Sequence, residues 1–559
     1  MNAVSVQHPA SRNTPLVEVE DLKVSFGREN KRTVVDGVSF VLERGECLAL
    51  VGESGCGKSV TARTLVGLTG YGAHVEAQRL CLAGEDIRTF DERAWHRVRG
   101  GRVGLIMQDA LGSLDPLRTV GKEVGEPLEV HTRLTRDDRQ ARVHSLLESV
   151  GIPDPVVRAL QRPHQLSGGL RQRALIASAI ACGPELLIAD EPTTSLDASI
   201  QAQVLELLES LRTDQNAMLI ISHDLAVVAR LADRVAVMHN GRIVEEGPTA
   251  AILEAPQHPH TKSLLLAASA VHAVGASWGH CSSSPATRAV LQAESVSKSF
   301  PTPAGKKINA VAGVSFELRA GETLGVVGES GSGKTTLLRI LLGLESPESG
   351  QVKVEDQLWA GLPGGRQRQE RRRMQAIFQD PLGSFDPCYT VERVIGQALD
   401  LRGLPRGQAR RERLLDLMHL VSLDPAYLAR RPIELSGGQR QRVAIARALA
   451  MEPEILVCDE PVSALDVSVQ AKILELLEDL KQRLRLSCLF ISHDLGIVRR
   501  VSDRVLVMHQ GLIVEAGTAD EVFSNPRHPY TVKLLNAIPR LRYEQAQPHH
   551  APELTRASL

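Results

Sequence analysis

The chain carries the same series of short motifs twice, about 270 residues apart. Each copy contains, in one order, a G-x-x-x-x-G-K-[ST] loop, a glutamine after an apolar run, an L-S-G-G phrase, an Asp-Glu pair and an I-S-H-D phrase. The serine of L-S-G-G and the glutamate of the acidic pair are 24 residues apart in both copies, from 167 to 191 and from 436 to 460. Chance can supply one such loop but not two matched series. The sequence therefore predicts two equivalent nucleotide-handling domains in one polypeptide.

Both glycine-rich loops stand in the context that phosphate binding requires. Each follows a short apolar run, CLALVG or TLGVVG, and precedes a helix-like segment, which gives the order strand, loop, helix. The glycines let backbone N–H groups converge on phosphate oxygens, and the helix N-terminus adds a favourable dipole. The lysine is expected to neutralise the β- and γ-phosphates, and the final hydroxyl to ligate Mg²⁺. The phosphate-binding candidates are Gly52, Ser54, Gly55, Gly57, Lys58 and Ser59 in the first copy and Gly328, Ser330, Gly331, Gly333, Lys334 and Thr335 in the second, with Ser59 and Thr335 also as metal ligands.

The two acidic pairs each follow four apolar residues. An acid at the carboxyl end of a parallel strand faces the ligand crevice of an open α/β sheet. Asp190 and Asp459 are therefore expected to hold Mg²⁺ through its bound water. Glu191 and Glu460 are expected to orient or deprotonate the water that attacks the γ-phosphate.

A histidine and a glutamine complete each set. His223 and His493 follow apolar runs within I-S-H-D, where an imidazole can contact the γ-phosphate and the attacking water. An isolated histidine is more often structural, but the matched positions favour a catalytic role. Gln108 and Gln379 follow the apolar pairs IM and IF and are candidates for binding Mg²⁺ or the water.

The L-S-G-G phrase supplies a second candidate anion site. A serine hydroxyl and two glycine N–H groups precede a helix-like segment, RQRALIASAI or RQRVAIARAL. One domain cannot easily place two anion sites on one triphosphate, whereas two domains facing head to tail can. The residues assigned to this site are Ser167, Gly168 and Gly169 in the first copy and Ser436, Gly437 and Gly438 in the second.

Together these motifs resemble those of ATP-binding cassette (ABC) proteins over nearly the whole chain. The resemblance implies that Phe26 and Phe300 stack on adenine, and that Ser195-Leu196-Asp197 and Ala464-Leu465-Asp466 form the loop that crosses the interface between cassettes. The first signature phrase departs from the family pattern, because Leu170 stands where glutamine is usual. We expect this change to tune the site formed with the second P-loop rather than to abolish it.

Two further pairs of phrases narrow the class of ABC protein that the chain resembles. DALGSLDP and DPLGSFDP follow the two glutamines, and HPHTKSLLLA and HPYTVKLLNAIP follow the two cassettes. The latter pair resembles the tail of the dipeptide/oligopeptide/nickel importer ATPases, although alone it would indicate only a helix start with proline near its first position. The resemblance implies a fused energy-coupling ATPase of a peptide-type importer that uses ATP and Mg²⁺. It also implies two membrane permease subunits, an extracytoplasmic solute-binding protein, a peripheral position on the cytoplasmic face of the plasma membrane, and no need for a homodimer.

Composition bears on the alternative functions. The 65 basic and 66 acidic residues nearly cancel, which gives no drive toward nucleic acid. The eight cysteines form no CxxC pair, so neither a disulfide framework nor a metal cluster is expected. No apolar run approaches the roughly 20 residues that span a bilayer, and the N-terminus lacks a secretory signal pattern. The alternative is a soluble tandem ABC ATPase acting on ribosomes or nucleic acid, which the short, weakly charged junction disfavours. A non-enzymatic binding module would need both acidic pairs to be idle.

The alternation of strand-like and helix-like segments predicts an α/β fold of two tandem P-loop NTPase domains. Each is expected to have a parallel-sheet core, an N-terminal antiparallel β part and an inserted helical subdomain, near residues 120–150 and 391–421. The predicted organisation is a disordered N-terminus (1–15), ATPase domain 1 (16–247), its importer-type extension (248–270), a linker (271–289), ATPase domain 2 (290–517), its extension (518–541) and a flexible tail (542–559).

One cysteine lies inside the first phosphate-binding loop. Cys56 precedes a helix N-terminus, where the pKa of a thiol tends to fall. Ser332 occupies the same place in the second copy. The hypothesis is that alkylation of Cys56 blocks only the first site and that ATP protects it, although a small, unreactive residue is an equally good interpretation.

Overall fold

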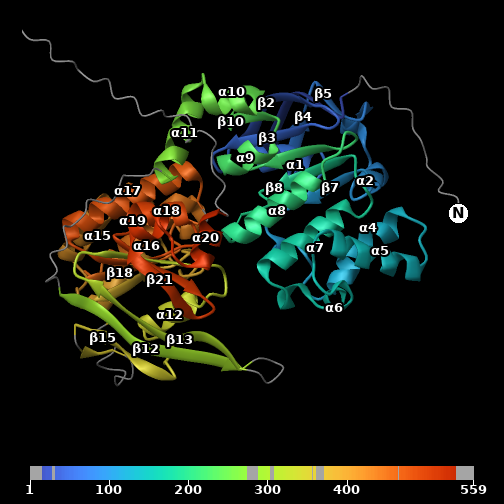
Figure 1. Ribbon diagram of the computed structural model, residues 1–559. Helices are drawn as coiled ribbons and strands as arrows, with labels where there is room; N and C mark the ends of the chain where they lie inside the picture. The colour runs from blue at the N-terminus through green and yellow to red at the C-terminus, as the bar shows by residue number, and fades with distance from the viewer. Residues whose placement is uncertain are drawn as a thin grey trace, which may run out of the picture. The chain divides into compact units, whose positions relative to one another are not determined.

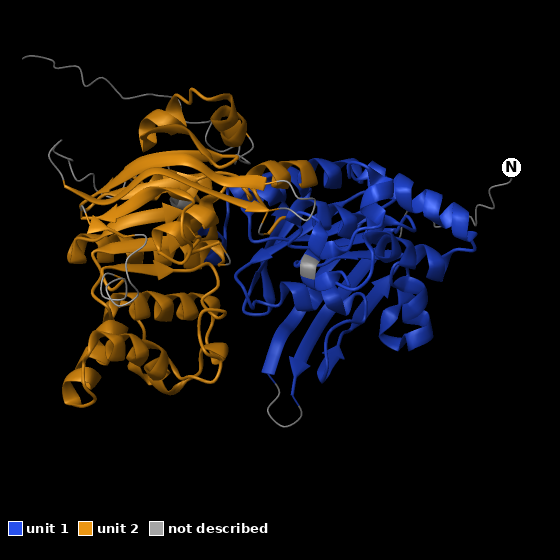
Figure 2. Ribbon diagram, turned by 90° about the horizontal axis from the view of Figure 1, so that it is seen from below, with its two compact units in different colours: residues 1–192, 205–262, 539–559 blue, residues 193–204, 263–538 orange. Residues whose placement is uncertain are grey.

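The computed structural model describes residues 15–27, 32–194, 196–272, 288–301, 307–355, 357–359, 371–463 and 465–536. The chain divides into two compact units, coloured separately in Figure 2. Among the described residues, unit 1 comprises 15–192 and 205–262, and unit 2 comprises 193–204 and 263–536. Most of the predicted linker and N-terminus, and all of the predicted tail, lie outside the described residues.

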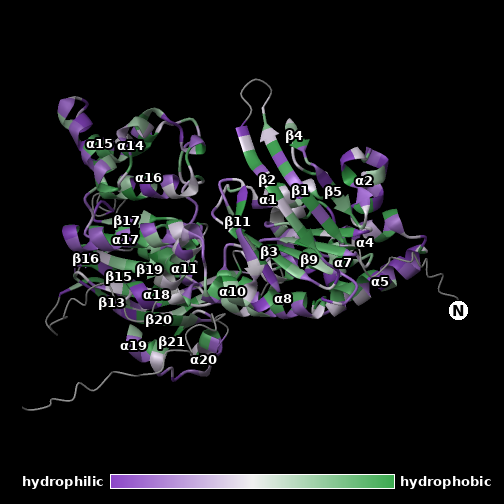
Figure 3. Cartoon of the chain, turned by 90° about the horizontal axis from the view of Figure 1, so that it is seen from above, coloured by the Kyte–Doolittle hydropathy of each residue, from purple (hydrophilic) through white to green (hydrophobic). Residues whose placement is uncertain are grey.

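The core of unit 1 is a six-stranded sheet in the order β11-β10-β3-β9-β8-β7, in which all neighbouring pairs are parallel except β10 with β11. Strands β3, β8 and β9 are buried along their whole length, which explains their uninterrupted apolar sequences. Hydropathy colouring shows β3 and β9 as mostly hydrophobic (Figure 3). The strands are β3 (Cys47–Gly52), β7 (Val103–Ile106), β8 (Leu186–Asp190), β9 (Ala217–Ile221), β10 (Arg234–His239) and β11 (Arg242–Pro248).

A second, antiparallel sheet in unit 1 has the order β2-β1-β5-β6, with β4 also paired to β1. Apolar side chains of β1 and β2 share one core with those of β3 and β9. The strands are β1 (Val17–Phe26), β2 (Arg32–Leu42), β4 (Ala73–Glu76), β5 (Arg79–Leu82) and β6 (Glu85–Asp86).

Helices of the first half of the chain alternate with these strands in the sequence (Figure 1), and α8 and α11 each run across the division between the two units. Helices α4, α5 and α6 stand between β7 and β8, where the inserted helical subdomain is predicted. The helices are α1 (Lys58–Thr64), α2 (Glu92–Val98), α3 (Ala110–Ser113), α4 (Val120–His131), α5 (Arg136–Ser149), α6 (Pro155–Ala159), α7 (Gly168–Ile180), α8 (Ala198–Ser210), α9 (Leu225–Leu231), α10 (Thr249–Glu254) and α11 (Pro259–His272), with 3₁₀ turns η1 (Ile87–Thr89) and η2 (Pro163–Gln165).

Unit 2 repeats this plan. Its mainly parallel sheet has the order β17-β18-β19-β14-β20-β21, and its antiparallel sheet has the order β13-β12-β15-β16. The strands are β12 (Ala289–Pro301), β13 (Lys307–Arg319), β14 (Thr323–Val327), β15 (Ser349–Val354), β16 (Gln357–Leu358), β17 (Met374–Ile377), β18 (Ile455–Asp459), β19 (Ser487–Ile491), β20 (Arg504–His509) and β21 (Leu512–Thr518). The helices are α12 (Lys334–Leu341), α14 (Val391–Arg402), α15 (Gln408–Leu420), α16 (Gly437–Leu449), α17 (Val467–Leu484), α18 (Leu495–Val501), α19 (Ala519–Ser524) and α20 (Pro529–Asn536), with η3 (Pro425–Ala429) and η4 (Pro432–Glu434).

The predicted fold class is confirmed, because each unit combines a mainly parallel sheet, an antiparallel sheet and helices between the P-loop and the acidic pair. Within the described ranges, we find no helix that is long and apolar enough to cross a membrane.

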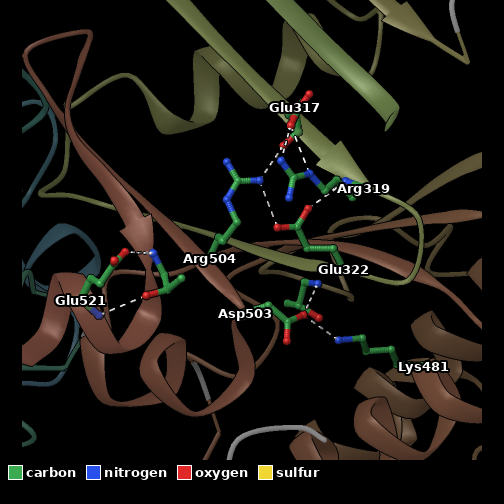
Figure 4. A network of polar contacts seen from close by, with 9 residues as sticks. Glu317, Arg319, Glu322, Lys481, Asp503, Arg504 and Glu521 are labelled. Atoms are coloured by element: carbon green, nitrogen blue, oxygen red, sulfur yellow. Dashed lines mark hydrogen bonds and ion pairs between the residues drawn. The ribbon is translucent and has the colours of Figure 1, made fainter. Parts of the chain in front are cut away.

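A polar network anchors the strand that leads into the second P-loop (Figure 4). The ammonium of Lys481 on α17 lies 3.1 Å from Oδ2 of Asp503, and the same oxygen accepts the N–H of Thr323 at 2.8 Å. Thr323 is the first residue of β14. Nearby, the guanidinium of Arg504 donates to Glu322 at 3.1 Å. The network thus fixes the start of β14, and the P-loop follows the end of that strand.

Candidate functional site

Both P-loops need glycine at positions of close backbone approach. Gly52 and Gly57 have φ of 150° and 104°, and Gly328 and Gly333 have φ of 155° and 105°. A Cβ at Gly52 would collide with the carbonyl oxygen of Met238, and one at Gly57 would lie 2.9 Å from the carbonyl oxygen of Val34. Only glycine satisfies both the left-handed φ and the missing space. The loop that the motif predicts is therefore built in both units.

The P-loop lysines are buried and point back over their own loops. Lys58 Nζ donates to the carbonyl oxygens of Gly52 at 2.8 Å and Glu53 at 2.9 Å. Lys334 Nζ makes the same contacts with Gly328 at 2.6 Å and Glu329 at 2.9 Å. Burial lowers the pKa of Lys334, and the negative charges of Asp459 and Glu460 oppose that shift. Each lysine is thus held at the loop that it is predicted to serve.

The first acid of each pair suits a cation. Ser59 Oγ donates to Asp190 Oδ1 at 2.8 Å. Asp190 is 1% exposed, and its Oδ2 has no hydrogen-bond partner among the described residues, although the guanidinium of Arg63 lies 3.6 Å away. Burial raises the pKa of Asp190. Burial and the adjacent Glu460 raise the pKa of Asp459 to about 6. A buried carboxylate oxygen beside a serine hydroxyl is a donor set that Mg²⁺ accepts.

The second acid of each pair adopts an unusual backbone conformation. Glu191 and Glu460 have φ of 50° and 47°, in the left-handed region that residues other than glycine rarely occupy. Their N–H groups donate to the carbonyl oxygens of Ile221 and Ile491, each at 2.9 Å. Strain of this kind concentrates at functional sites. The backbone therefore turns both glutamates at the carboxyl edge of the sheet in the same way.

Each glutamate contacts the histidine of the same motif series. His223 Nδ1 lies 3.2 Å from Glu191 Oε1, and His493 Nδ1 lies 3.0 Å from Glu460 Oε1. Burial opposes protonation, but the glutamate contact outweighs it and raises the pKa of both histidines. Burial alone would raise the pKa of Glu460, yet the contact with His493 holds it below its usual value. Both units therefore contain a coupled carboxylate–imidazole pair at the predicted catalytic position.

The two predicted glutamines differ. Gln108 Nε2 donates to Glu191 Oε2 at 2.7 Å, which joins glutamine, glutamate and histidine in one group. Gln379 is exposed just after β17, and Thr335 is exposed in the first turn of α12.

The predicted adenine-stacking residues lie at the C-terminal ends of β1 and β12, where Phe26 is half-buried and Phe300 is 40% exposed.

The signature phrases begin helices, and their difference has a local cause. Ser167 and Ser436 are the N-caps of α7 and α16. In the second copy Ser436 Oγ accepts the N–H of Gln439 at 3.3 Å, and Gln439 Oε1 accepts the N–H of Ser436 at 3.0 Å, which is a capping box. Leu170 has no side-chain acceptor to return this bond. The first signature therefore keeps only the serine half of the cap, with the N–H of Leu170 at 3.4 Å.

Unit 2 contains contacts at its P-loop that the sequence motifs do not identify. Asp197, in the segment 193–204 that belongs to this unit, accepts the N–H of Ser330 on Oδ1 at 2.8 Å. The hydroxyl of Tyr530 accepts the N–H of Glu329 at 3.0 Å. The resemblance named Asp197 but not its partner, and the only sequence sign of Tyr530 is its place in HPYT. Ser195 and Ala464, also named by the resemblance, lie outside the described residues.

The expected fall in the pKa of the Cys56 thiol is wrong, and the alternative of an unreactive residue fits the structure. The residue is 6% exposed, and burial raises the pKa of its thiol even though Lys58 Nζ lies 3.8 Å from the sulfur. Desolvation of the thiolate outweighs the nearby charge and the helix dipole. Cys56 is thus a buried, protonated thiol rather than an activated one.

Comparison with known proteins identifies the family. The ABC transporter family matches residues 35–194 and 311–463, and the C-terminal region of oligopeptide/dipeptide transporters matches residues 244–289 and 514–558. The chain belongs to the ABC transporter family, in the fused tandem-cassette form of the dipeptide/oligopeptide/nickel importer group. It is an ATPase coupled to transport.

Individual relatives match along almost their full length. The glutathione import ATP-binding protein GsiA of Salmonella typhimurium is 41% identical over 94% of this chain and 89% of its own length, and the protein of the same name from Escherichia coli gives the same values. The peptidoglycan transport ATP-binding protein YejF of Agrobacterium fabrum is 43% identical over 94% of this chain and 96% of its own length. The chain is therefore similar to these import and transport ATP-binding proteins across both cassettes and not in a single domain.

Proposed function

We propose that this chain is the energy-coupling ATPase of an importer for glutathione, peptides or related solutes. The observation that carries the proposal is the similarity to import and transport ATP-binding proteins over 94% of the chain, together with a carboxylate–imidazole pair in each unit. The importer-type extension after each cassette supports the same class. We also propose the cassette boundaries 16–247 and 290–517, with extensions 248–270 and 518–541.

In the proposed reaction each P-loop cradles one ATP through its backbone N–H groups, and its lysine moves onto the β- and γ-phosphates. Glu191 and Glu460 accept a proton from the attacking water and orient it in line with the γ-phosphate. The paired glutamates raise the pKa of both histidines, which favours the cationic imidazole near the γ-phosphate. Ser59 with Asp190, and Thr335 with Asp459 at the second site, would hold Mg²⁺, which would neutralise phosphate charge when bound.

We propose that the two active sites are shared between cassettes. Each signature phrase is a helix N-terminus with an anion-binding serine and two glycines, and a head-to-tail pair places it on the nucleotide of the other P-loop. Lys58 then faces Ser436 across one ATP, and Lys334 faces Ser167 across the other. Because Leu170 cannot return the capping hydrogen bond, the N-terminus of α7 is less firmly capped than that of α16. In the proposed pairing, α7 serves the site of the second P-loop.

The proposed assembly is peripheral to the cytoplasmic face of the plasma membrane. Two permease subunits would bind the cassettes near Gln108 and Gln379, and an extracytoplasmic binding protein would deliver the solute. ATP binding would close the cassettes, and hydrolysis would reopen them. The segments after the two glutamines, DALGSLDP and DPLGSFDP, would pass this motion to the permeases.

The test is affinity purification of the tagged chain from membranes solubilised in a mild detergent, followed by identification of the proteins that accompany it. The proposal expects two integral-membrane permeases in the complex, and ATPase activity that rises with the liganded binding protein. A chain recovered with ribosomes or nucleic acid and without permeases would overturn the proposal and favour a tandem ABC ATPase of the non-transport kind.

A further inference from the structure

The importer-type extension of unit 2 reaches its own P-loop through one side chain. Tyr530, the third residue of HPYT, is 8% exposed, and its hydroxyl accepts the N–H of Glu329 at 3.0 Å. Its ring stacks on that of His509, with centroids 3.8 Å apart and planes inclined by 30°. Burial raises the pKa of Tyr530 to about 12, so the phenol stays neutral and keeps both its donor and its acceptor.

A carboxylate fixes the turn that carries this tyrosine. Glu515 on β21 accepts the N–H groups of Arg527 at 2.7 Å and His528 at 3.1 Å. His528 Nδ1 in turn accepts the N–H of Tyr530 at 3.2 Å. These bonds occupy the orphan donors at the start of α20. The phenol is therefore presented by a rigid turn whose strand, β21, belongs to the central sheet of the same unit.

The tyrosine and the P-loop lysine hold one residue from both sides. The N–H of Glu329 is bound by Tyr530, and its carbonyl oxygen is bound by Lys334 Nζ at 2.9 Å. Lys334 also donates to the carbonyl oxygen of Gly328. The peptide groups on both sides of Glu329 are thus fixed, and with them the start of the loop that carries Lys334.

Unit 1 builds the same turn without the hydroxyl. Glu245 accepts the N–H groups of Gln257 at 2.7 Å and His258 at 3.1 Å, and His258 Nδ1 accepts the N–H of His260 at 3.1 Å. The His260 ring stacks on His239 at 3.8 Å. Its Nε2 is buried and has no hydrogen-bond partner within the described part of the chain. Burial, followed by the charge of His239, lowers the pKa of His260. Within the described residues the scaffold is shared, and the position of His260 is taken in the second cassette by a phenol that contacts the P-loop.

We propose that Tyr530 is a positioning residue for the second ATP site. Nucleotide affinity at the second P-loop then depends on the importer-type extension through this side chain. Nucleotide affinity at the first P-loop does not depend on His260 in this way. The inference rests on the assignment of residues 328–335 as an ATP site. Removing the hydroxyl leaves the Glu329 N–H without its acceptor, so the fraction of loops in the binding-competent conformation falls and the apparent Kd rises by the same factor.

The experiment measures binding of a fluorescent ATP analogue, 2′/3′-N-methylanthraniloyl-ATP, to the full-length chain, one site at a time. The Lys58→Ala background reports the second P-loop, and the Lys334→Ala background reports the first. In Lys58→Ala, Tyr530→Phe is expected to weaken binding about fivefold, the loss of one net hydrogen bond. In Lys334→Ala, the matched control His260→Phe is expected to change binding less than about twofold, because no hydrogen bond is lost.

A second readout separates positioning from structural damage. With Lys58 restored, Tyr530→Phe should raise the KM for ATP more than it lowers kcat, and thermal unfolding of the chain should not change. Wild-type affinity in Tyr530→Phe would overturn the proposal, as would equal weakening at both P-loops or a lowered Tm that accounts for the loss. If the Lys58→Ala chain with Tyr530 intact binds no analogue, the ATP-site assignment fails and this inference falls with it.

Discussion

The ion pair between Lys481 and Asp503 gives a prediction with an internal control. Asp503→Asn removes the charge that lies 3.1 Å from the ammonium of Lys481, while its amide oxygen can still accept the N–H of Thr323. The two side chains are only 8% and 21% exposed. Unit 1 has the equivalent pair of Arg212 and Asp233 at 2.6 Å, with Asp233 accepting the N–H of Cys47, but these side chains are 30% and 48% exposed.

The exposed fractions of these side chains determine how much stability each substitution is expected to cost. Removing the charge of Asp503 from beside a buried ammonium is expected to cost about 3 kcal/mol. The Arg212 guanidinium can be resolvated after Asp233→Asn, so that cost should stay below about 1 kcal/mol. Because each 1.4 kcal/mol is a factor of ten, the opening equilibrium of β14 and α17 should increase by about 100-fold, whereas that of β3 should increase by less than about fivefold.

Native-state hydrogen exchange, read by mass spectrometry on peptides from β14, α17 and β3, measures both openings in the same chain. The double variant Lys481→Met with Asp503→Asn is the control, since replacing both charges should recover most of the protection. Equal effects of the two aspartate substitutions, or a double variant no better protected than Asp503→Asn, would refute the reasoning.

Further predictions concern the active-site groups. Glu191→Gln and Glu460→Gln should each lower ATP turnover by at least about 100-fold at the altered site while ATP binding remains, because the general base is lost; unchanged turnover in both single variants and the double would remove these residues from catalysis. The pKa of His493 should lie above its usual 6.5, so its ion pair with Glu460 stabilises the fold below that pH, and this contribution is lost as pH rises through the raised pKa. In Glu460→Gln the pKa should fall below 6.5 because burial then dominates, and NMR titration of the imidazole measures it; an unchanged pKa would disprove the coupling. Cys56 should react with maleimide more slowly than the exposed Cys388, since its thiol is buried and its pKa raised; faster labelling of Cys56 in a peptide map would contradict this.

Much of the fold could be predicted because the central strands are buried on both faces. The apolar runs at 47–52, 186–190 and 455–459 coincide with β3, β8 and β18. Helix α17 is longer than the amphipathic segment ILELLEDLK that indicated it, and runs from Val467 to Leu484. Its first residues follow Asp466 as N-cap, a signal of helix start that periodicity does not contain.

The site could be predicted in its residue types but not in its environment. The motifs indicated Glu191 and His223 as candidates that act on the attacking water, but not the 3.2 Å contact between the two side chains. The left-handed φ of Glu191 could not be read from the sequence, because it depends on the hydrogen bond to Ile221 in the neighbouring strand. The pKa of Cys56 was misjudged because local position indicates the dipole but not the burial. Tyr530 was missed as a site residue because its contact with Glu329 spans 201 residues of sequence.

The measurement that tests the central claim most directly is solute uptake by proteoliposomes that contain the chain with its co-purified permeases and binding protein. Labelled glutathione and a labelled dipeptide should accumulate only when ATP is present on the side of the cassettes, and the Glu191→Gln, Glu460→Gln double variant should abolish accumulation while its ATP binding persists. Uptake that is equally fast without the chain, or with the double variant, would contradict the account.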